Sequence, residues 1–186
     1  FHEFETKAIL LKYLKTLPDI TIIEFFNSPG MLVEYSHGNG LYRLFRADMD
    51  ALPVKETTGC DFMSRNEGIM HSCGHDVHMT ILLGLIEEIT KIKPAANLLF
   101  LFQPAEEGQG GAESILAEGI IQQYPVESVY ALHIASGMPV GTVSSRPGIF
   151  FGVPQEFNVE FYGITAHAVT PEKGIDALRA GRIFLD

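Results

Sequence analysis

The stretch NLLFLFQPAEEG, residues 97–108, decides the fold class of this chain of 186 residues. Five of its first six side chains are apolar and follow one another without a polar residue between them. Such an unbroken run is typical of a strand buried on both faces, because a strand with one face in solvent alternates apolar and polar residues. The proline and glycine that follow end the strand and fix the backbone around Glu106 and Glu107. Residues 97–102 therefore predict an internal strand with two carboxylates just beyond its carboxyl end.

The segments on either side of this strand complete an α/β pattern. Residues 77–92 carry apolar side chains at helical spacing and follow Asp76, a residue type that commonly caps the start of a helix. A crossover helix is expected over 112–121 and a second strand buried on both faces over 126–134. Strand, helix and strand in this order predict a mostly parallel α/β sheet flanked by helices.

The remaining segments suggest two domains. The first is expected over residues 1–153, beginning with a helix over 3–16 and three short strands over 20–26, 31–35 and 41–45. The second is expected over residues 154–186, as the start of a smaller α/β lid or dimerisation domain with a strand over 157–162 and a helix from Ile175. Because the last helical pattern reaches the end of the chain without a cap or breaker, we expect this domain to be truncated.

Composition excludes several classes of partner. The formal charge of −10 and the absence of a lysine or arginine cluster disfavour nucleic acid and anionic membrane surfaces. Two cysteines are too few for the disulfide framework of a small secreted domain, and no apolar run approaches the roughly 20 residues that span a bilayer. The sequence therefore predicts a cytoplasmic protein that binds neither nucleic acid nor a membrane surface.

A thiol, two imidazoles and a carboxylate lie close together in the run HSCGHD, residues 71–76, directly before the predicted helix. Thiolate and neutral imidazole bind borderline divalent metals, and Gly74 allows side chains two residues apart to converge. Cys73 and His75 are the predicted ligands, with His71 and Asp76 in supporting positions. The alternative is a buried cysteine beside polar residues that cap the helix.

The adjacent carboxylates after the predicted strand can divide two tasks. Successive side chains point in different directions, so one carboxylate can bind a metal while its neighbour faces the water on that metal. We assign Glu107 as the ligand and Glu106 as the general base that takes the proton from water and delivers it to the leaving amine.

Three further residues end predicted strands. His133 follows the apolar run that precedes it and is predicted as a metal ligand, because its strand is expected beside the one that carries the glutamates. Asp48 and Asp50 lie just beyond the strand expected over 41–45 and share a face by alternation. They are predicted to orient ligand imidazoles, with turn formation as the alternative.

These motifs, taken in order, resemble one enzyme family. They are FRADMDALP at 45–53, MHSCGHD at 70–76, FQPAEEG at 102–108, LHI at 132–134 and GITAHA at 163–168. The set is similar to the amidohydrolases related to aminoacylase and hippurate hydrolase. This resemblance implies that the predicted sheet belongs to a metal-dependent exopeptidase-like catalytic domain. Each motif alone is weak, but their joint order over most of the chain is specific.

The resemblance implies a two-metal site with ligands Cys73, His75, Glu107 and His133, Glu106 as acid and base, and a further histidine ligand that these 186 residues do not contain. It also implies that His167 stabilises the oxyanion, often across a homodimer formed by the second domain. Many relatives have a metal-binding histidine where Asp48 stands, which puts direct metal binding by Asp48 in doubt. The expected metals are manganese, zinc, cobalt or nickel.

The expected activity is removal of an acyl group from an N-acyl amino acid. A carboxypeptidase or hippurate-type hydrolase of the same family is the nearest alternative, and a non-catalytic metal-binding fragment is a second. A cysteine hydrolase with Cys73 attacking is a third, disfavoured because a nucleophile and base two residues apart rarely reach attack geometry.

Overall fold

The computed structural model describes residues 1–108, 110–152 and 157–186. The chain divides into two compact units, residues 1–144 and 145–186, which are described separately. Among the described residues, no helix is both long enough and apolar enough to cross a bilayer.

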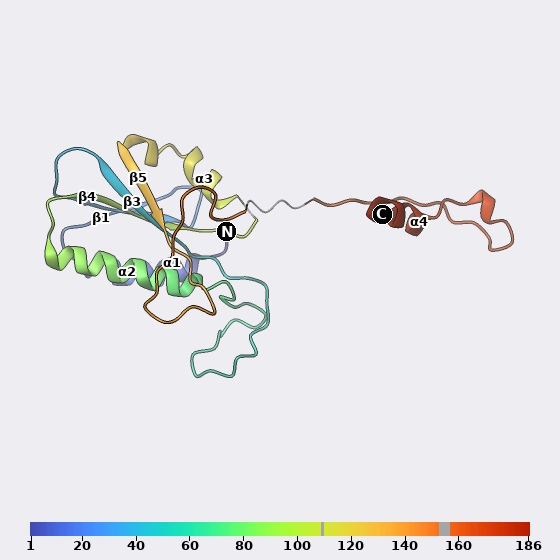
Figure 1. Ribbon diagram of the computed structural model, residues 1–186, viewed down its shortest axis with the longest axis horizontal. Coiled ribbons are helices and arrows are strands. Elements are labelled where there is room, and N and C mark those ends of the chain that lie inside the picture. Colours follow the sequence, from blue (N-terminus) through green and yellow to red (C-terminus); the bar gives the residue numbers. More distant parts are fainter. Residues whose placement is uncertain (109, 153–156) are drawn as a thin grey trace. The chain divides into compact units, whose positions relative to one another are not determined.

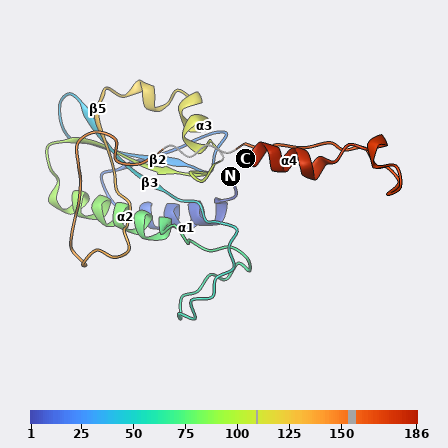
Figure 2. The same cartoon turned by 45° about the vertical axis from the view of Figure 1, so that its right-hand side comes forward.

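The first unit is a five-stranded sheet with helices on both faces (Figures 1 and 2). Its elements in chain order are α1 Phe4–Leu14, β1 Thr21–Glu24, β2 Met31–Ser36, β3 Tyr42–Asp48, α2 His75–Ile92, β4 Asn97–Gln103, α3 Gly111–Ala117, the 3-10 helix η1 Ile121–Gln123 and β5 Val126–Ala131. The strand order is β1-β2-β4-β3-β5. Helices α1 and α2 lie on one face of the sheet and α3 lies on the other.

Strand direction follows from the pairing of neighbours. β2 is antiparallel to both β1 and β4, whereas β3 is parallel to both β4 and β5. Four strands therefore run in one direction and β2 alone opposes them, which confirms a mostly parallel α/β sheet. The carboxyl ends of β3, β4 and β5 consequently share one edge, with Asp48 beside Gln103 in the register.

Strand β4 is buried along its whole length and separates two hydrophobic cores, as its sequence predicts. Its side chains alternate between the faces, so Leu98, Phe100 and Phe102 pack in the core under α1 and α2. Leu99 and Leu101 pack with Ile115 of α3 in the smaller core on the other face. A strand covered on both sides has no polar face, which is why its sequence shows none.

Four expectations need correction in this unit. β5 is an edge strand with largely exposed side chains, not a strand buried on both faces, because it has a single neighbour, β3. The strand before His133 was expected beside the strand that carries the glutamates, but β3 lies between β5 and β4. It ends at Ala131, so His133 lies two residues beyond it. The crossover helix is shorter than expected and gives way to η1.

The second unit contains little regular structure. Its elements are the 3-10 helix η2 Pro171–Lys173 and α4 Ala177–Leu185, whose start is capped by the Asp176 side chain. The strand expected over 157–162 does not form, and an isolated bridge joins Ile164 to Ile175 instead. Pro154, the boundary proposed from the sequence, lies outside the described residues, so the division into domains over 1–153 and 154–186 stays a prediction.

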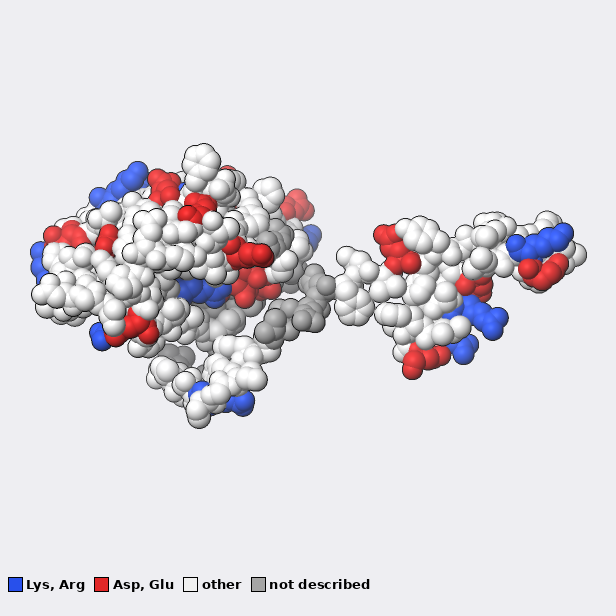
Figure 3. All heavy atoms as spheres, turned by 90° about the horizontal axis from the view of Figure 1, so that it is seen from above, with Lys and Arg blue, Asp and Glu red and all other residues white. Residues whose placement is uncertain are grey.

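Basic side chains are dispersed on the visible face of the first unit (Figure 3). On the face drawn in Figure 3, the lysine and arginine side chains of the first unit are separate groups and do not form one basic patch. Several lysine and arginine side chains of this unit form salt bridges, including Lys7 with Glu24 at 2.9 Å and Arg43 with Glu127 at 2.8 Å.

Candidate metal centre

Four segments meet at the carboxyl edge of the sheet. Residues 48–50 leave β3, residues 104–107 leave β4, residues 132–134 leave β5, and residues 71–75 form the turn that begins α2. A bridge between Leu52 and Met70 closes the long intervening loop and returns the chain to this edge. Functional groups at the carboxyl ends of parallel strands are typical of α/β folds.

The turn before α2 depends on glycine. Gly74 has φ +81 and precedes His75, the first residue of the helix. A Cβ at this position would lie 2.2 Å from Cδ1 of Ile134, so the segment after β5 packs directly on the turn. Asp76 is therefore not the helix cap expected from the sequence, because the helix begins one residue before it.

His75 presents one ring nitrogen to the site and uses the other as an anchor. Its Nδ1 lies 2.9 Å from the backbone oxygen of Asp50 and 3.1 Å from Oδ1 of the same residue. Both atoms are acceptors, so Nδ1 donates the proton and Nε2 carries a lone pair. Nε2 is buried and has no hydrogen-bond partner within the described parts of the chain.

Carboxylates surround this lone pair. Nε2 of His75 lies 3.8 Å from Asp48, 4.0 Å from Glu106 and 3.9 Å from Glu107. Burial acts to lower the pKa of His75, but the hydrogen bond to Asp50 and the charges of Asp48 and Asp50 raise it above its ordinary value. The site thus attracts a positive charge near Nε2, whether a proton or a metal ion.

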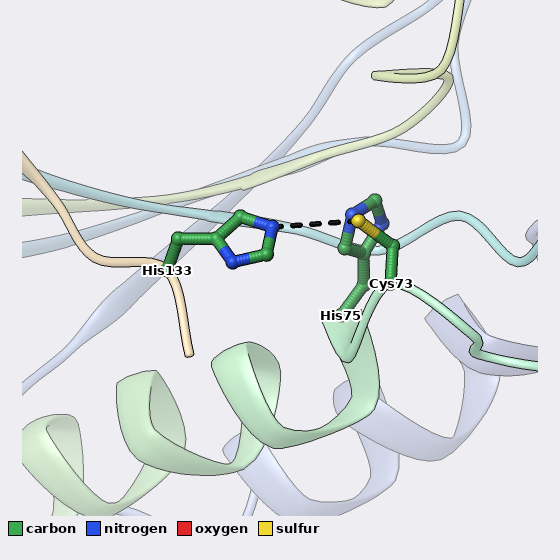
Figure 4. Close-up of side chains that lie close together, drawn as sticks. All are labelled: Cys73, His75 and His133. Carbon is green, nitrogen blue, oxygen red and sulfur yellow. Dashed lines mark hydrogen bonds between the residues drawn. The ribbon is translucent and has the colours of Figure 1, made fainter. Parts of the chain in front are cut away.

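Cys73 and His133 meet across the turn (Figure 4). The Sγ atom lies 3.4 Å from Nε2 of His133, whose Nδ1 donates to the backbone oxygen of Ile134 at 2.7 Å. Nε2 therefore accepts, and the thiol donates to it. Burial first, and then the neighbouring carboxylate of Glu107, raise the pKa of Cys73 to about 11, so without metal the thiol is protonated at neutral pH.

The segment after β4 is held in an unusual conformation. Ala105 has φ +49, and its N–H donates to the buried carboxylate of Glu3 at 3.0 Å. The N–H of Glu107 donates to Oδ2 of Asp50 at 3.0 Å. These bonds fix the backbone on both sides of Glu106, whose carboxylate and that of Glu107 remain partly exposed beside His75.

Asp50 is the link between two predicted ligands. Its carboxylate accepts from the His75 ring and from the Glu107 backbone. Burial alone would raise the pKa of Asp50, but these hydrogen bonds, with a further one from the Glu106 backbone, lower it to about 2. The carboxylate is thus ionised at neutral pH and orients both segments, the arrangement that supports many metal-binding histidines.

Asp48 is committed to other partners. Its Oδ2 accepts from Arg46 at 2.8 Å and its Oδ1 accepts from Nδ1 of His78 at 2.6 Å. Both carboxylate oxygens of Asp48 thus already accept hydrogen bonds, which argues against direct metal binding by this residue.

The remaining predicted residues are not joined to this group. Asp76 is exposed on the first turn of α2, and Nδ1 of His71 is buried without a hydrogen-bond partner among the residues described. His167 belongs to the second unit, where Nδ1 accepts from the Val169 N–H at 3.2 Å. The roles assigned to these three residues stay predictions.

Sequence reasoning missed His78. This residue is buried in α2, three positions after His75 and on the same side of the helix, and it contacts Asp48 and the segment after β5. The spacing of three in the run HDVH could have drawn attention to it, because residues three apart share a helix face.

The donors present fit a divalent cation. Two groups have donor atoms within 4.8 Å of one another and share His75: Cys73 with His133, and Glu106 with Glu107. Nε2 of His75 is buried and has no hydrogen-bond partner among the described residues, as expected of a ligand atom whose partner is a metal. A third group, Asp48 with His75 and His78, fits poorly because the two ring nitrogens of His78 and both oxygens of Asp48 are already bonded.

An α/β sheet with thiol, imidazole and carboxylate donors at its carboxyl edge is typical of metal-dependent hydrolases. The family model for "Peptidase family M20/M25/M40" matches residues 44–181, and the chain belongs to this family. The fold class and the family resemblance predicted from the motifs are thereby confirmed.

Individual relatives agree with the family. An N-acetyldiaminopimelate deacetylase of Exiguobacterium sibiricum is 39% identical over 97% of this chain, which spans 49% of that relative. A crystal structure from methicillin-resistant Staphylococcus aureus matches with a TM-score of 0.77 and 31% identity, over 99% of this chain and 49% of the other. The Bacillus subtilis YXEP protein, described as a dinuclear metal-binding peptidase of the M20 family, matches with a TM-score of 0.72 and 31% identity, over 77% of this chain and 40% of its own.

Proposed function

We propose that this chain is the metal-binding part of an amidohydrolase that removes the acyl group from an N-acyl amino acid. The observation that carries the proposal is that two sets of possible ligands share His75: Cys73 with His133, and Glu106 with Glu107. Within each set the donor atoms lie within 4.8 Å of one another, and among the described residues Nε2 of His75 has no hydrogen-bond partner. The chain spans about half the length of the curated relatives it matches, so the activity is that of the longer protein.

The residues divide the chemistry of amide hydrolysis. Two divalent cations, held by Cys73, His75, Glu107 and His133, would lower the pKa of water and polarise the scissile carbonyl. Glu106 accepts the proton of the attacking water and returns it to the leaving nitrogen, so no covalent enzyme intermediate is needed. Asp50 keeps His75 in the tautomer whose Nε2 carries the lone pair.

The names of the relatives support one substrate. N-acetyldiaminopimelate is therefore the first compound to test. If the longer protein hydrolyses it, the enzyme would act in lysine biosynthesis. Hippurate-type compounds and short peptides are the alternatives within the family. Manganese, zinc, cobalt and nickel are all compatible with mixed thiolate, imidazole and carboxylate ligands.

Other parts of the proposal concern the longer protein. We propose a catalytic domain over 1–153, a lid or dimerisation domain that begins at 154, a homodimer, and a cytoplasmic location. His167 would then stabilise the oxyanion from the second domain. Neither a nucleic acid nor a membrane is a proposed partner.

A Glu106→Gln variant tests the proposal in a protein extended to the length of its relatives. Its amide cannot accept the proton but keeps the shape of the side chain, so metal content should be unchanged while turnover falls by roughly 10²–10⁴-fold or more. Glu113→Gln, an exposed residue in the first turn of α3, is the matched control and should keep full activity.

Metal content by elemental analysis and rates on N-acetyldiaminopimelate, hippurate and a dipeptide give the outcome. Full activity in Glu106→Gln would remove the central role of this residue. Metal binding without hydrolysis of any of the three substrates by the unmodified protein would favour the non-catalytic alternative.

A further inference from the structure

His78 lies at the junction of two ligand-bearing segments. Its side chain is fully buried, and its Nε2 lies 2.9 Å from the backbone nitrogen of Ile134, the residue after His133. A backbone N–H can only donate, so Nε2 accepts and carries no proton. The proton of the neutral ring is therefore on Nδ1, where it is donated to Asp48 at 2.6 Å.

Asp48 continues the chain of hydrogen bonds toward β4. Its second oxygen accepts from Arg46 at 2.8 Å, and Nε of Arg46 donates to the side chain of Gln103 at 2.9 Å. Gln103 is the last residue of β4, three positions before Glu106. One continuous network thus joins the ends of β3 and β4, the start of α2 and the segment after β5.

Ile134 is fixed by its side chain as well as by its backbone. Its Cδ1 occupies the space where a Cβ of Gly74 would lie, between Cys73 and His75. Its carbonyl oxygen accepts from Nδ1 of His133 at 2.7 Å and so sets the orientation of that ring. The position of Ile134 consequently determines where Nε2 of His133 points.

We propose that His78 is a positioning residue for metal binding, which holds Ile134 and thereby aims Nε2 of His133 at Cys73. His78 is not itself a ligand, because both of its ring nitrogens are bonded to the protein. Asp48 serves the same purpose by fixing the tautomer of His78. This inference rests on the proposed role of His133 as a ligand.

Two substitutions separate the two bonds of His78. In His78→Gln the amide oxygen reaches the position of Nε2 and can accept from Ile134, whereas in His78→Asn the amide reaches only the position of Nδ1, toward Asp48. We expect His78→Asn to weaken metal binding by roughly 10–100-fold and His78→Gln to stay closer to the unmodified protein. His37→Gln is the control, since His37 stacks on Tyr35 away from these residues.

Metal affinity is measured by competition with a chelator in the longer protein, and thermal unfolding of the metal-free variants is measured beside it. A merely structural role would lower the unfolding temperature of both variants without a difference in metal affinity between them. Equal affinities for His78→Asn, His78→Gln and the unmodified protein, or equal losses in both variants, would overturn the inference.

A measurement on the unmodified protein covers the case in which a variant does not fold. Long-range ¹H–¹⁵N spectra of the metal-free protein should show His78 protonated on Nδ1 alone, and protonation on Nε2 would contradict the network. His133→Ala separates the two proposals. If it binds metal as tightly as the unmodified protein, the proposed metal site fails; if it loses metal while His78→Asn does not, only the positioning role fails.

Discussion

Cys73 and His133 are sixty positions apart in the chain, yet Sγ of one lies 3.4 Å from Nε2 of the other. The contact arises because the parallel strands β3 and β5 end at the same edge of the sheet and α2 begins there. Placement of the two residues on opposite faces would have been incompatible with a shared cation. The fold therefore brings the two side chains within reach of one cation.

The thiol of Cys73 should react slowly when no metal is present. Its pKa is raised to about 11, so the thiolate fraction is small at pH 8 and grows about tenfold per pH unit up to that value. In a Cys60→Ser background with chelator, alkylation at pH 8 should be roughly 10²-fold slower than that of an ordinary thiol of pKa about 8.5. A Cys73→Ser protein, with Cys60 as its single thiol, is the control for accessibility of the reagent.

The same experiment tests the cysteine-hydrolase alternative. A nucleophilic cysteine requires a lowered pKa and would alkylate rapidly at pH 7, with loss of activity and retention of metal. That result would revive attack by Cys73 and contradict its assignment as a metal ligand.

Gly74→Ala should damage the turn more than a comparable change elsewhere. The new Cβ would lie 2.2 Å from Cδ1 of Ile134. The alanine would also have to adopt φ +81, a backbone conformation that costs about 1–2 kcal/mol for a non-glycine residue. Gly68→Ala is the matched control, with φ +77 and nothing within 4 Å of its Cβ. Chemical denaturation should show the larger loss of stability in Gly74→Ala, and equal losses would mean that Ile134 moves aside freely.

Asp50→Asn should weaken metal binding without changing any ligand. The amide offers one oxygen where the carboxylate offers two. Either the Glu107 N–H therefore loses its acceptor, or the His75 ring loses its side-chain acceptor and keeps only the backbone oxygen of residue 50. Loss of such a supporting group typically reduces metal affinity by 10–100-fold, about the drop expected here in chelator competition. Asp61→Asn, on an exposed loop, should bind metal normally, and normal binding by Asp50→Asn would show that His75 orients itself.

Phe100→Ala should destabilise the first unit by about 3–5 kcal/mol, because a large side chain is removed from the middle of β4. Phe100 is fully buried and its ring stacks on Phe45 with centroids 5.8 Å apart. Phe26→Ala is the control, since this ring is 93% exposed and its loss should change stability by less than about 0.5 kcal/mol. Similar denaturation midpoints for the two variants would contradict the central position of β4 in the core.

The elements that sequence alone could place are those whose pattern is local. The apolar run of β4 and the helical spacing of α2 both reflect burial along a single segment, and both elements form where they were expected. The segments that carry the predicted ligands could also be grouped, because parallel strands bring their carboxyl ends together. The roles of the individual ligands stay predictions.

The errors concern properties that depend on distant partners. The apolar run of β5 predicts burial on both faces, but burial requires neighbours, and this strand has a single one in the sheet described. Residues 157–162 alternate as a strand does, yet a strand also needs a hydrogen-bonding partner, and in the described part of the second unit none pairs with them. The reversed direction of β2 likewise leaves no mark in its own sequence.

The amino-acid sequence by itself determined the α/β class, the central strand and the segments that supply thiol, imidazole and carboxylate groups. Only the tertiary structure decided that His78 and Asp48 are bonded to each other and to the segment of His133. The physical reason is that hydrophobic periodicity and turn residues act within a short segment. Hydrogen bonds between side chains of separate segments exist only once the sheet has brought those segments together.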